Sequence, residues 1–295
     1  MRQAPFAFCV LQIQATKMLN LQKLVIDRTV KELETAYKQS YGNRSPLLGE
    51  TVTWCGHLAL ENIANSDALY HDVDHTIMVT LVGQAILQGK HLLEGGVSPR
   101  DWLHFMMALL CHDIGYVRGV CKLDTEEAVA TGIGDELITL GPGSTDAALA
   151  PYHVDRSKLF IRERFEEPLF IEIDTDAIMS YIELTRFPVP DDDYYHQTNG
   201  YAGLVRAADF IGQLGDPNYL RKLPALFHEL EEVDNENKIG YNSLADMRKN
   251  YARFFWDVVN PYIQDALRYL RVTQEGKQWI ANLHAHVFDI EHSRH

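Results

Sequence analysis

The chain has 295 residues, enough for a large buried core, and a formal charge of −14 from 27 Lys and Arg against 41 Asp and Glu. Such an acidic surface repels phosphate backbones, so we expect no nucleic-acid polymer as a partner. No apolar stretch reaches the roughly 18 residues of a membrane span, the apolar run over 5–11 is too short and lacks a cleavage site for a signal peptide, and four cysteines without a CxxC pair predict a cytoplasmic protein without a structural zinc site.

Helical periodicity of the apolar residues dominates the chain. The segment 19–41 alternates apolar and charged positions as an amphipathic helix does, and Gly42 to Pro46 ends it. Few segments alternate with a period of two, so we predict an all-α fold. Further helices are predicted over 51–65, 67–88, 99–111, 125–132, 172–186, 201–215, 219–235, 243–270 with a break near Pro261, and 273–288.

Two long polar segments interrupt the helices. The segment 132–155 is rich in Gly, Pro, Ser and Thr, and the segment 188–200 carries three consecutive aspartates and His196. Loops of this length in a compact domain often contact substrate or act as lids. We predict a helical extension over 1–50, a central domain over 51–235, and helices over 236–295 packed on the same core. The flanking helices can cover the core or form a homodimer contact.

An adjacent His-Asp pair interrupts a strongly apolar helix. His112 and Asp113 follow Leu109 to Cys111 directly, and burying an ionised carboxylate in such a place requires a compensating charge. His75 lies in an earlier helical run and Asp209 in a later one. Two imidazole nitrogens and two carboxylate oxygens suit a borderline or hard divalent cation. We therefore predict a metal site made by these four residues.

The order of these residues, H…HD…D between about 70 and 215, resembles the HD-domain superfamily of metal-dependent phosphohydrolases. The segment from Tyr70 to His75 is similar to one in the cyclic-nucleotide phosphodiesterases. The resemblance implies an HD-domain helical core within 51–235 with additional N- and C-terminal helices. It also implies that His71 is the catalytic proton donor, that His75 is a ligand, and that Asp113 is both a ligand and a bridge between two metals. Two residues depart from family patterns: Asp72 replaces an asparagine, and Tyr116 replaces the lysine of the cyclic-dinucleotide branch.

The chemistry implied is cleavage of a mono- or diester of a nucleotide, or of another small phosphorylated metabolite, by metal-activated water. One or two divalent ions are expected, and the donor set does not distinguish Mn, Mg, Fe, Zn, Ni and Co. Because guanidinium groups pair well with phosphate, four cations are candidate phosphate contacts: Arg118, Lys122, Arg156 and Arg186.

Two further histidines leave alternatives open. His153 and His196 lie between the HD pair and Asp209, where they could hold a second metal or contact substrate. Some HD-fold proteins use extra histidines in that interval to hold a di-iron centre with oxygenase activity. A third hypothesis is a non-catalytic sensor module that binds a nucleotide without hydrolysing it.

Overall fold

The computed structural model describes residues 20–166, 172–233 and 240–292. In this part of the chain the fold is all-α, and its strands, β1 (Val129–Ala130) and β2 (Leu137–Ile138), form one short antiparallel pair. The all-α prediction is confirmed. Among the described residues, no helix has the length and apolar character needed to cross a bilayer.

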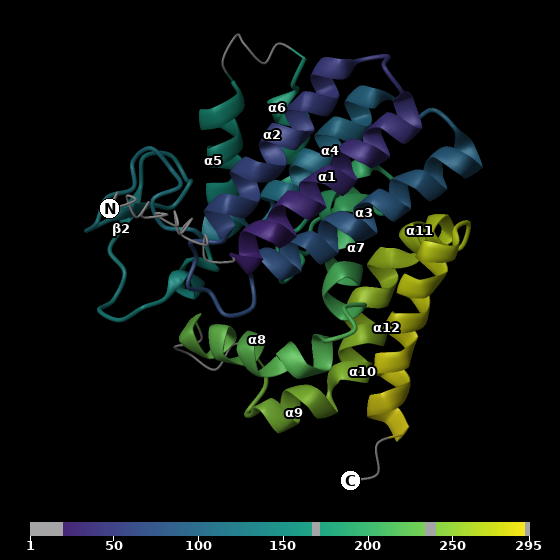
Figure 1. Cartoon of the computed structure of the whole chain (residues 1–295). Helices are drawn as coiled ribbons and strands as arrows, with labels where there is room; N and C mark the ends of the chain where they lie inside the picture. The colour runs from purple at the N-terminus through teal and green to yellow at the C-terminus, as the bar shows by residue number, and fades with distance from the viewer. Residues whose placement is uncertain (1–19, 167–171, 234–239, 293–295) are drawn as a thin grey trace, which may run out of the picture.

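The N-terminal half forms a layered helical bundle. It contains α1 (Leu21–Tyr41), α2 (Pro46–Ile63), α3 (Val73–Glu94) and α4 (Pro99–Cys111), with α1 on α2 and α2 on α4 (Figure 1). The prediction of α4 matches both of its ends, because Ser98 and Asp101 form a capping box and Pro99 occupies the first turn.

Helix α7 (Tyr201–Leu214) packs tightly along α3 in the centre of the molecule. Gly212 makes this approach possible, since a Cβ there would lie 2.6 Å from the Cα of Val79. Helices α5 (His153–Phe165) and α6 (Thr175–Glu183) pack on each other, and α6 also contacts α4 and α7. The 3-10 turns η1 (Ile114–Tyr116), η2 (Asp146–Leu149) and η4 (Asp193–His196) lie in the connections.

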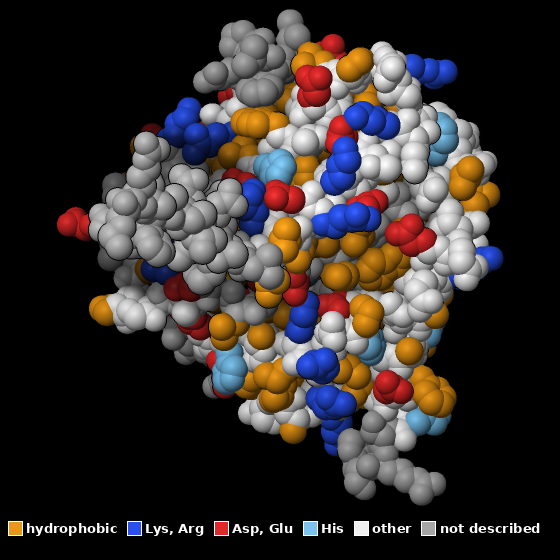
Figure 2. Space-filling model, viewed as in Figure 1, with side chains coloured by type: hydrophobic (Ala, Val, Ile, Leu, Met, Phe, Trp, Pro, Cys, Tyr) orange, Lys and Arg blue, Asp and Glu red, His pale blue; other side chains and the backbone are white. Residues whose placement is uncertain are grey.

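The C-terminal helices return to the same core. α11 (Asn260–Leu270) contacts both α3 and α7, and α12 (Gln274–His292) packs on α11. Between α7 and α11 the chain forms α8 (Tyr219–Val233), α9 (Leu244–Lys249), α10 (Tyr251–Phe254) and a π-helical turn, Phe255–Val259. Charged side chains of both signs are interspersed on the face shown in Figure 2.

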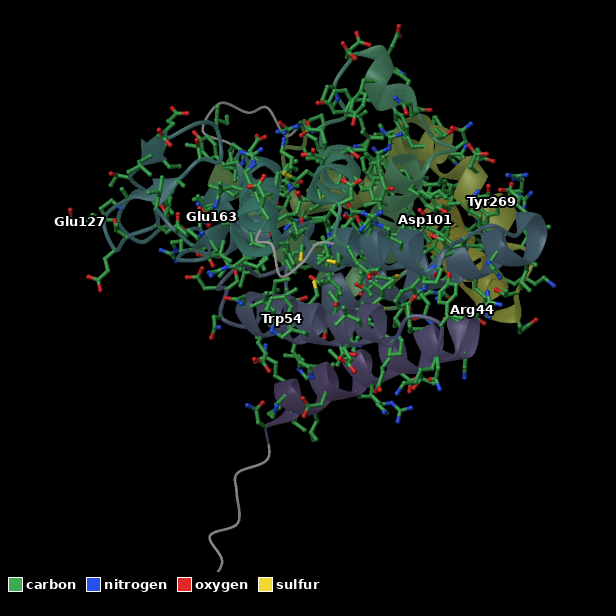
Figure 3. All side chains as sticks on the ribbon, turned by 90° about the horizontal axis from the view of Figure 1, so that it is seen from above. Arg44, Trp54, Asp101, Glu127, Glu163 and Tyr269 are labelled. Carbon is green, nitrogen blue, oxygen red and sulfur yellow. The ribbon has the colours of Figure 1, made fainter. Side chains whose placement is uncertain are left out.

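The helix predicted over 125–132 is wrong. The side chains of Asp124 and Thr125 accept hydrogen bonds from Ala130 and Ala128 backbone N–H groups, and these local bonds compete with a helix. Glu127 lies at the outer end of this non-helical segment, which projects from the molecule (Figure 3). Conversely, α5 begins at His153, so the last residues of the loop predicted over 132–155 are helical. The many charged residues of α5 hide its apolar stripe, which includes Phe160 and Ile161.

Candidate metal centre

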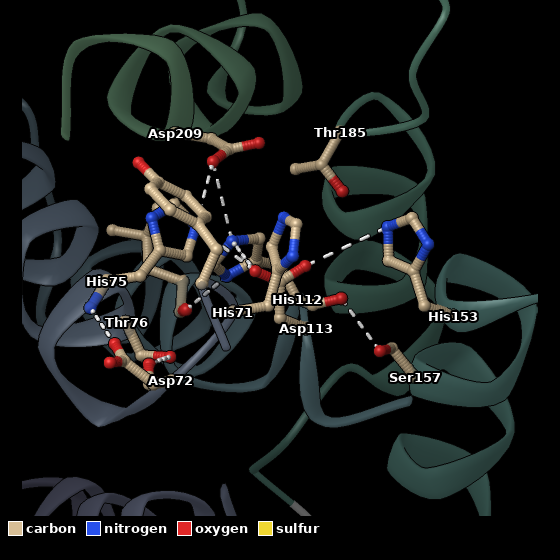
Figure 4. Close-up of polar contacts among 12 residues, drawn as sticks. His71, Asp72, His75, Thr76, His112, Asp113, His153, Ser157, Thr185 and Asp209 are labelled. Carbon is tan, nitrogen blue, oxygen red and sulfur yellow. Dashed lines mark hydrogen bonds and ion pairs between the residues drawn. The ribbon is translucent and has the colours of Figure 1, made fainter. Parts of the chain in front are cut away.

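Four side chains from three helical segments meet in the interior. His75 lies in the first turn of α3, Asp209 lies in α7, and His112 and Asp113 follow the last residue of α4. His75 Nε2 is 3.1 Å from Asp113 Oδ2 and 3.4 Å from Asp209 Oδ1. His112 Nε2 is 3.0 Å and 3.5 Å from the same two oxygens (Figure 4). The four predicted ligands therefore converge.

The spacing of these atoms fits a single ion. Ligands bound to one metal at ~2.1 Å are separated by roughly 3.0–3.4 Å in octahedral or tetrahedral geometry. Apart from the contacts within the cluster, His112 Nε2 and Asp113 Oδ2 are buried atoms without a hydrogen-bond partner among the described residues. His112 Nδ1 donates to the carbonyl oxygen of Leu109 at 2.7 Å, which leaves Nε2 as the nitrogen that faces the cluster. The donor set and its unsatisfied atoms fit a divalent metal, and two overlapping His/Asp groups here could hold one.

Charge compensation within the cluster is strong. Burial opposes ionisation of Asp209, yet the adjacent His112 and His75 lower its pKa to about 2. Burial also disfavours the charged form of His75, but hydrogen bonds to Asp113 and Asp209 raise its pKa to about 9. In the metal-free protein, protons on the imidazoles therefore compensate the carboxylates. A bound cation would displace these protons.

His71 lies beside the cluster but not on α3. Helix α3 begins at Val73, because the Asp72 side chain accepts a hydrogen bond from the His75 backbone N–H at 2.9 Å. The helix predicted over 67–88 therefore begins later than expected, and His71 does not share a helical face with His75. His71 lies in the preceding turn, with its ring centroid 5.4 Å from that of His75.

Glu229 of α8 holds His71 and was missed by the sequence analysis. Its Oε2 is 2.5 Å from His71 Nδ1, and its Oε1 accepts from the backbone N–H groups of Tyr70 and His71. Burial lowers the pKa of His71, but the charge and hydrogen bond of Glu229 outweigh it, so the pKa lies above its usual value. One signal was available: Glu229 stands one turn after Leu226 on the apolar stripe of α8.

His153 lies near Asp113 Oδ1, the carboxylate oxygen other than the one that approaches His75 and His112. Its Nδ1 lies 2.6 Å from the carbonyl oxygen of Ala150, and its Nε2 lies 3.8 Å from Asp113 Oδ1 (Figure 4). Ser157 connects α5 to the turn after the His-Asp pair, since its hydroxyl donates to the carbonyl oxygen of His112. Gly115 permits this contact, because a Cβ there would lie 2.0 Å from the carbonyl oxygen of His153.

Two of the predicted site residues lie elsewhere. The side chain of His196 is 53% exposed in η4, with Asp191 as its nearest acidic neighbour at 3.9 Å. Arg156 is fully buried, and its guanidinium group binds other parts of the protein. It donates to the carbonyl oxygens of Gly115 and Val117 and forms an ion pair with Asp124. Arg156 therefore has no donor left for a substrate, whereas the role of His196 at a second metal or a substrate stays a prediction.

Two other residues predicted to contact phosphate form ion pairs within the protein. Arg118 pairs with Asp146 and Asp67, while Arg186 pairs with Asp155 and Glu183. The side chain of Asp74, the residue before His75, is 62% exposed and lies 3.8 Å from Lys222. Lys122 lies on the surface, where its backbone N–H donates to Glu163.

These features define an all-α protein with a buried His/Asp cluster able to hold a metal ion. The chain belongs to the Npun_R2479-like family, whose model matches residues 19–293. A comparison with curated proteins found no match.

Proposed function

We propose that the protein is a metal-dependent phosphohydrolase of the HD-domain type. The observation that supports this proposal is the convergence of His75, His112, Asp113 and Asp209 beside a third histidine, His71, which is held by a carboxylate. The first group would hold the ion and the second would handle a proton. These are the two functions that hydrolysis of a phosphoester requires.

Two overlapping groups, His75 with His112 and Asp209, and His75 with Asp113 and His71, could each hold an ion. In our proposal His75, His112, Asp113 and Asp209 would hold it, and Asp113 Oδ1 would face His153. When bound, a divalent ion supplies a Lewis acid that polarises a phosphoryl oxygen and lowers the pKa of water. His71 would then protonate the departing alkoxide. Because Glu229 engages Nδ1, the proton for the substrate is carried on Nε2. General acid catalysis of this kind contributes about 10²–10⁴ in rate.

We further propose a small, nucleotide-like phosphorylated substrate and a cytoplasmic location. The formal charge of −14 disfavours a polymeric nucleic acid. Cys55, Cys111 and Cys121 are buried free thiols, as expected in a reducing compartment.

The second candidate function is oxygenase chemistry at a di-iron centre. The position of His153 favours it, because its Nε2 faces Asp113 and Nδ1 is already engaged by a backbone carbonyl. His196, the other histidine invoked for that centre, lies outside the cluster and gives no support.

The deciding experiment is hydrolysis of bis(p-nitrophenyl) phosphate with added Mn²⁺. Wild type is compared with His112→Ala, and His196→Ala serves as the control that removes an exposed imidazole. We expect turnover in wild type and in His196→Ala but none in His112→Ala. Metal content of each variant is measured in parallel. Stoichiometric iron with oxygen-dependent absorbance, and no hydrolysis in wild type, would replace the hydrolase proposal with the oxygenase one.

A further inference from the structure

Tyr116 lies between two histidines as the middle ring of a three-ring stack. Its centroid is 4.5 Å from that of His71 with an interplanar angle of 12°, and 4.6 Å from that of His153 with an angle of 22°. The residue is only 4% exposed. One phenol ring therefore contacts imidazoles that come from the turn before α3 and from the start of α5.

The backbone around Tyr116 is fixed from several directions. Its own N–H donates to the carbonyl oxygen of Asp113 at 3.0 Å, which forms the η1 turn. The N–H of the preceding residue, Gly115, donates to the Ser157 hydroxyl, and its carbonyl oxygen accepts from Arg156. The ring is thus attached to the same rigid turn that carries the metal ligand Asp113.

Each imidazole is hydrogen-bonded at one nitrogen only among its described contacts. His71 is held through Nδ1 by Glu229, and His153 through Nδ1 by the carbonyl oxygen of Ala150. A single hydrogen bond leaves the ring free to pivot about that bond. A flat aromatic surface against each ring removes this freedom and fixes where each Nε2 points.

We propose that Tyr116 is a positioning residue that fixes the ring planes of His71 and His153 through stacking. The catalytic consequence rests on the proposed function, in which His71 is the proton donor. The requirement is for an aromatic face, so the phenol hydroxyl is dispensable.

The kinetic test compares Tyr116→Phe with Tyr116→Met, which has comparable bulk but no ring. On bis(p-nitrophenyl) phosphate we expect Phe to retain the wild-type kcat. We expect Met to lower kcat by about 10²-fold, the scale of a misplaced catalytic group, with KM and bound Mn²⁺ little changed. Tyr37→Met is the matched control, because Tyr37 is a buried tyrosine whose ring lies 5.4 Å from that of Trp102, at an interplanar angle of 59°, and not against His71 or His153.

A second test does not require activity. Ring currents of Tyr116 should shift the imidazole C–H proton NMR signals of His71 and His153, which are assigned by their loss in His71→Asn and His153→Asn. The shifts should persist in Tyr116→Phe, collapse in Tyr116→Met, and remain in Tyr37→Met. Tyr116→Leu replaces the Met variant if that protein does not fold.

The outcomes separate the two proposals. If wild type hydrolyses no phosphoester, the proposed function fails and the NMR shifts alone decide the positioning role. Unchanged kcat and unchanged shifts in Tyr116→Met would overturn that role. Loss of activity in Tyr116→Phe equal to that in Tyr116→Met would also overturn it, because the hydroxyl would then be the active group.

Discussion

Asp113 is the residue on which the cluster depends most. Its Oδ2 lies within 3.1 Å of both His75 Nε2 and His112 Nε2, and no other described side chain approaches both nitrogens as closely. We expect Asp113→Ala to abolish high-affinity metal binding, measured by metal content after dialysis. Asp74→Ala, which removes an exposed aspartate next to His75, should bind metal like wild type. Retained stoichiometric metal in Asp113→Ala would contradict the assigned ligand set.

Glu229 sets the protonation of His71. The pKa of His71 is raised by the charge of Glu229 against the effect of burial, so His71 keeps its proton to higher pH than an ordinary histidine. An acid catalyst loses activity as pH rises through its pKa. In Glu229→Gln the basic limb of the kcat–pH profile should therefore move to lower pH.

The control for that prediction is Glu232→Gln on the same helix. Glu232 accepts hydrogen bonds from the backbone N–H and the hydroxyl of Thr145, and among the described residues it makes no hydrogen bond with His71. Its substitution should leave the basic limb in place. A profile that is identical in wild type and Glu229→Gln would show that Glu229 does not control the proton donor.

The four central ligands could be predicted at the residue scale because each is a polar residue within an apolar helical pattern. His153, Glu229 and Tyr116 could not be placed in this way. Their positions depend on how α5 and α8 pack against the turn after α4, and periodicity within one helix carries no information about that packing. Arg156 shows the reverse error: its type suits phosphate, but burial commits it to backbone carbonyls.

At the scale of single helices, the presence of residues typical of helix ends determined which helices could be predicted. Helix α4 has Ser98, Pro99 and Asp101 at its start, and its ends were predicted correctly. Helix α5 has no side-chain cap and a largely polar sequence, so its pattern was obscure. In 125–132, the side chains of Asp124 and Thr125 accept hydrogen bonds from nearby backbone N–H groups, and these bonds replace the helix that the sequence pattern favours.

The contact of α5 with the His-Asp turn depends on Gly115. A Cβ at this position would lie 2.0 Å from the carbonyl oxygen of His153 and 2.8 Å from Ser157 N, which are backbone atoms that cannot move alone. We expect Gly115→Ala to displace α5 and to lower the free energy of unfolding by about 1–3 kcal/mol, measured by urea denaturation. Gly200→Ala is the control, since a Cβ there meets nothing within 4 Å. Equal stability of the two variants would contradict the close packing.

At the scale of the whole molecule, metal binding should stabilise the fold in a pH-dependent way. The pKa of His75 is raised to about 9 in the metal-free protein, so at pH 6 to 8 the metal must displace its proton. Affinity should then increase about tenfold per pH unit for each proton released. A ligand bound only by the folded state at 100 times its Kd adds about 2.7 kcal/mol of stability.

The measurement is the Tm with saturating and with limiting Mn²⁺ at pH 6 and pH 8. At the limiting concentration the metal-dependent rise in Tm should be larger at pH 8. His112→Ala should show no such rise at either pH. A rise of the same size at both pH values would indicate that no histidine proton is displaced.

The bond between His71 and Glu229 joins positions 158 residues apart in the chain. Its partners belong to the turn before α3 and to α8, whereas the ion's four proposed ligands come from α3, α7 and the residues after α4. The residues that would set the affinity for the ion and the residue that sets the acid strength of His71 therefore lie in different segments of the sequence. If the proposed function holds, an engineer or natural selection can shift the pH dependence of the site by substitutions in α8 without changing the residues that would hold the metal.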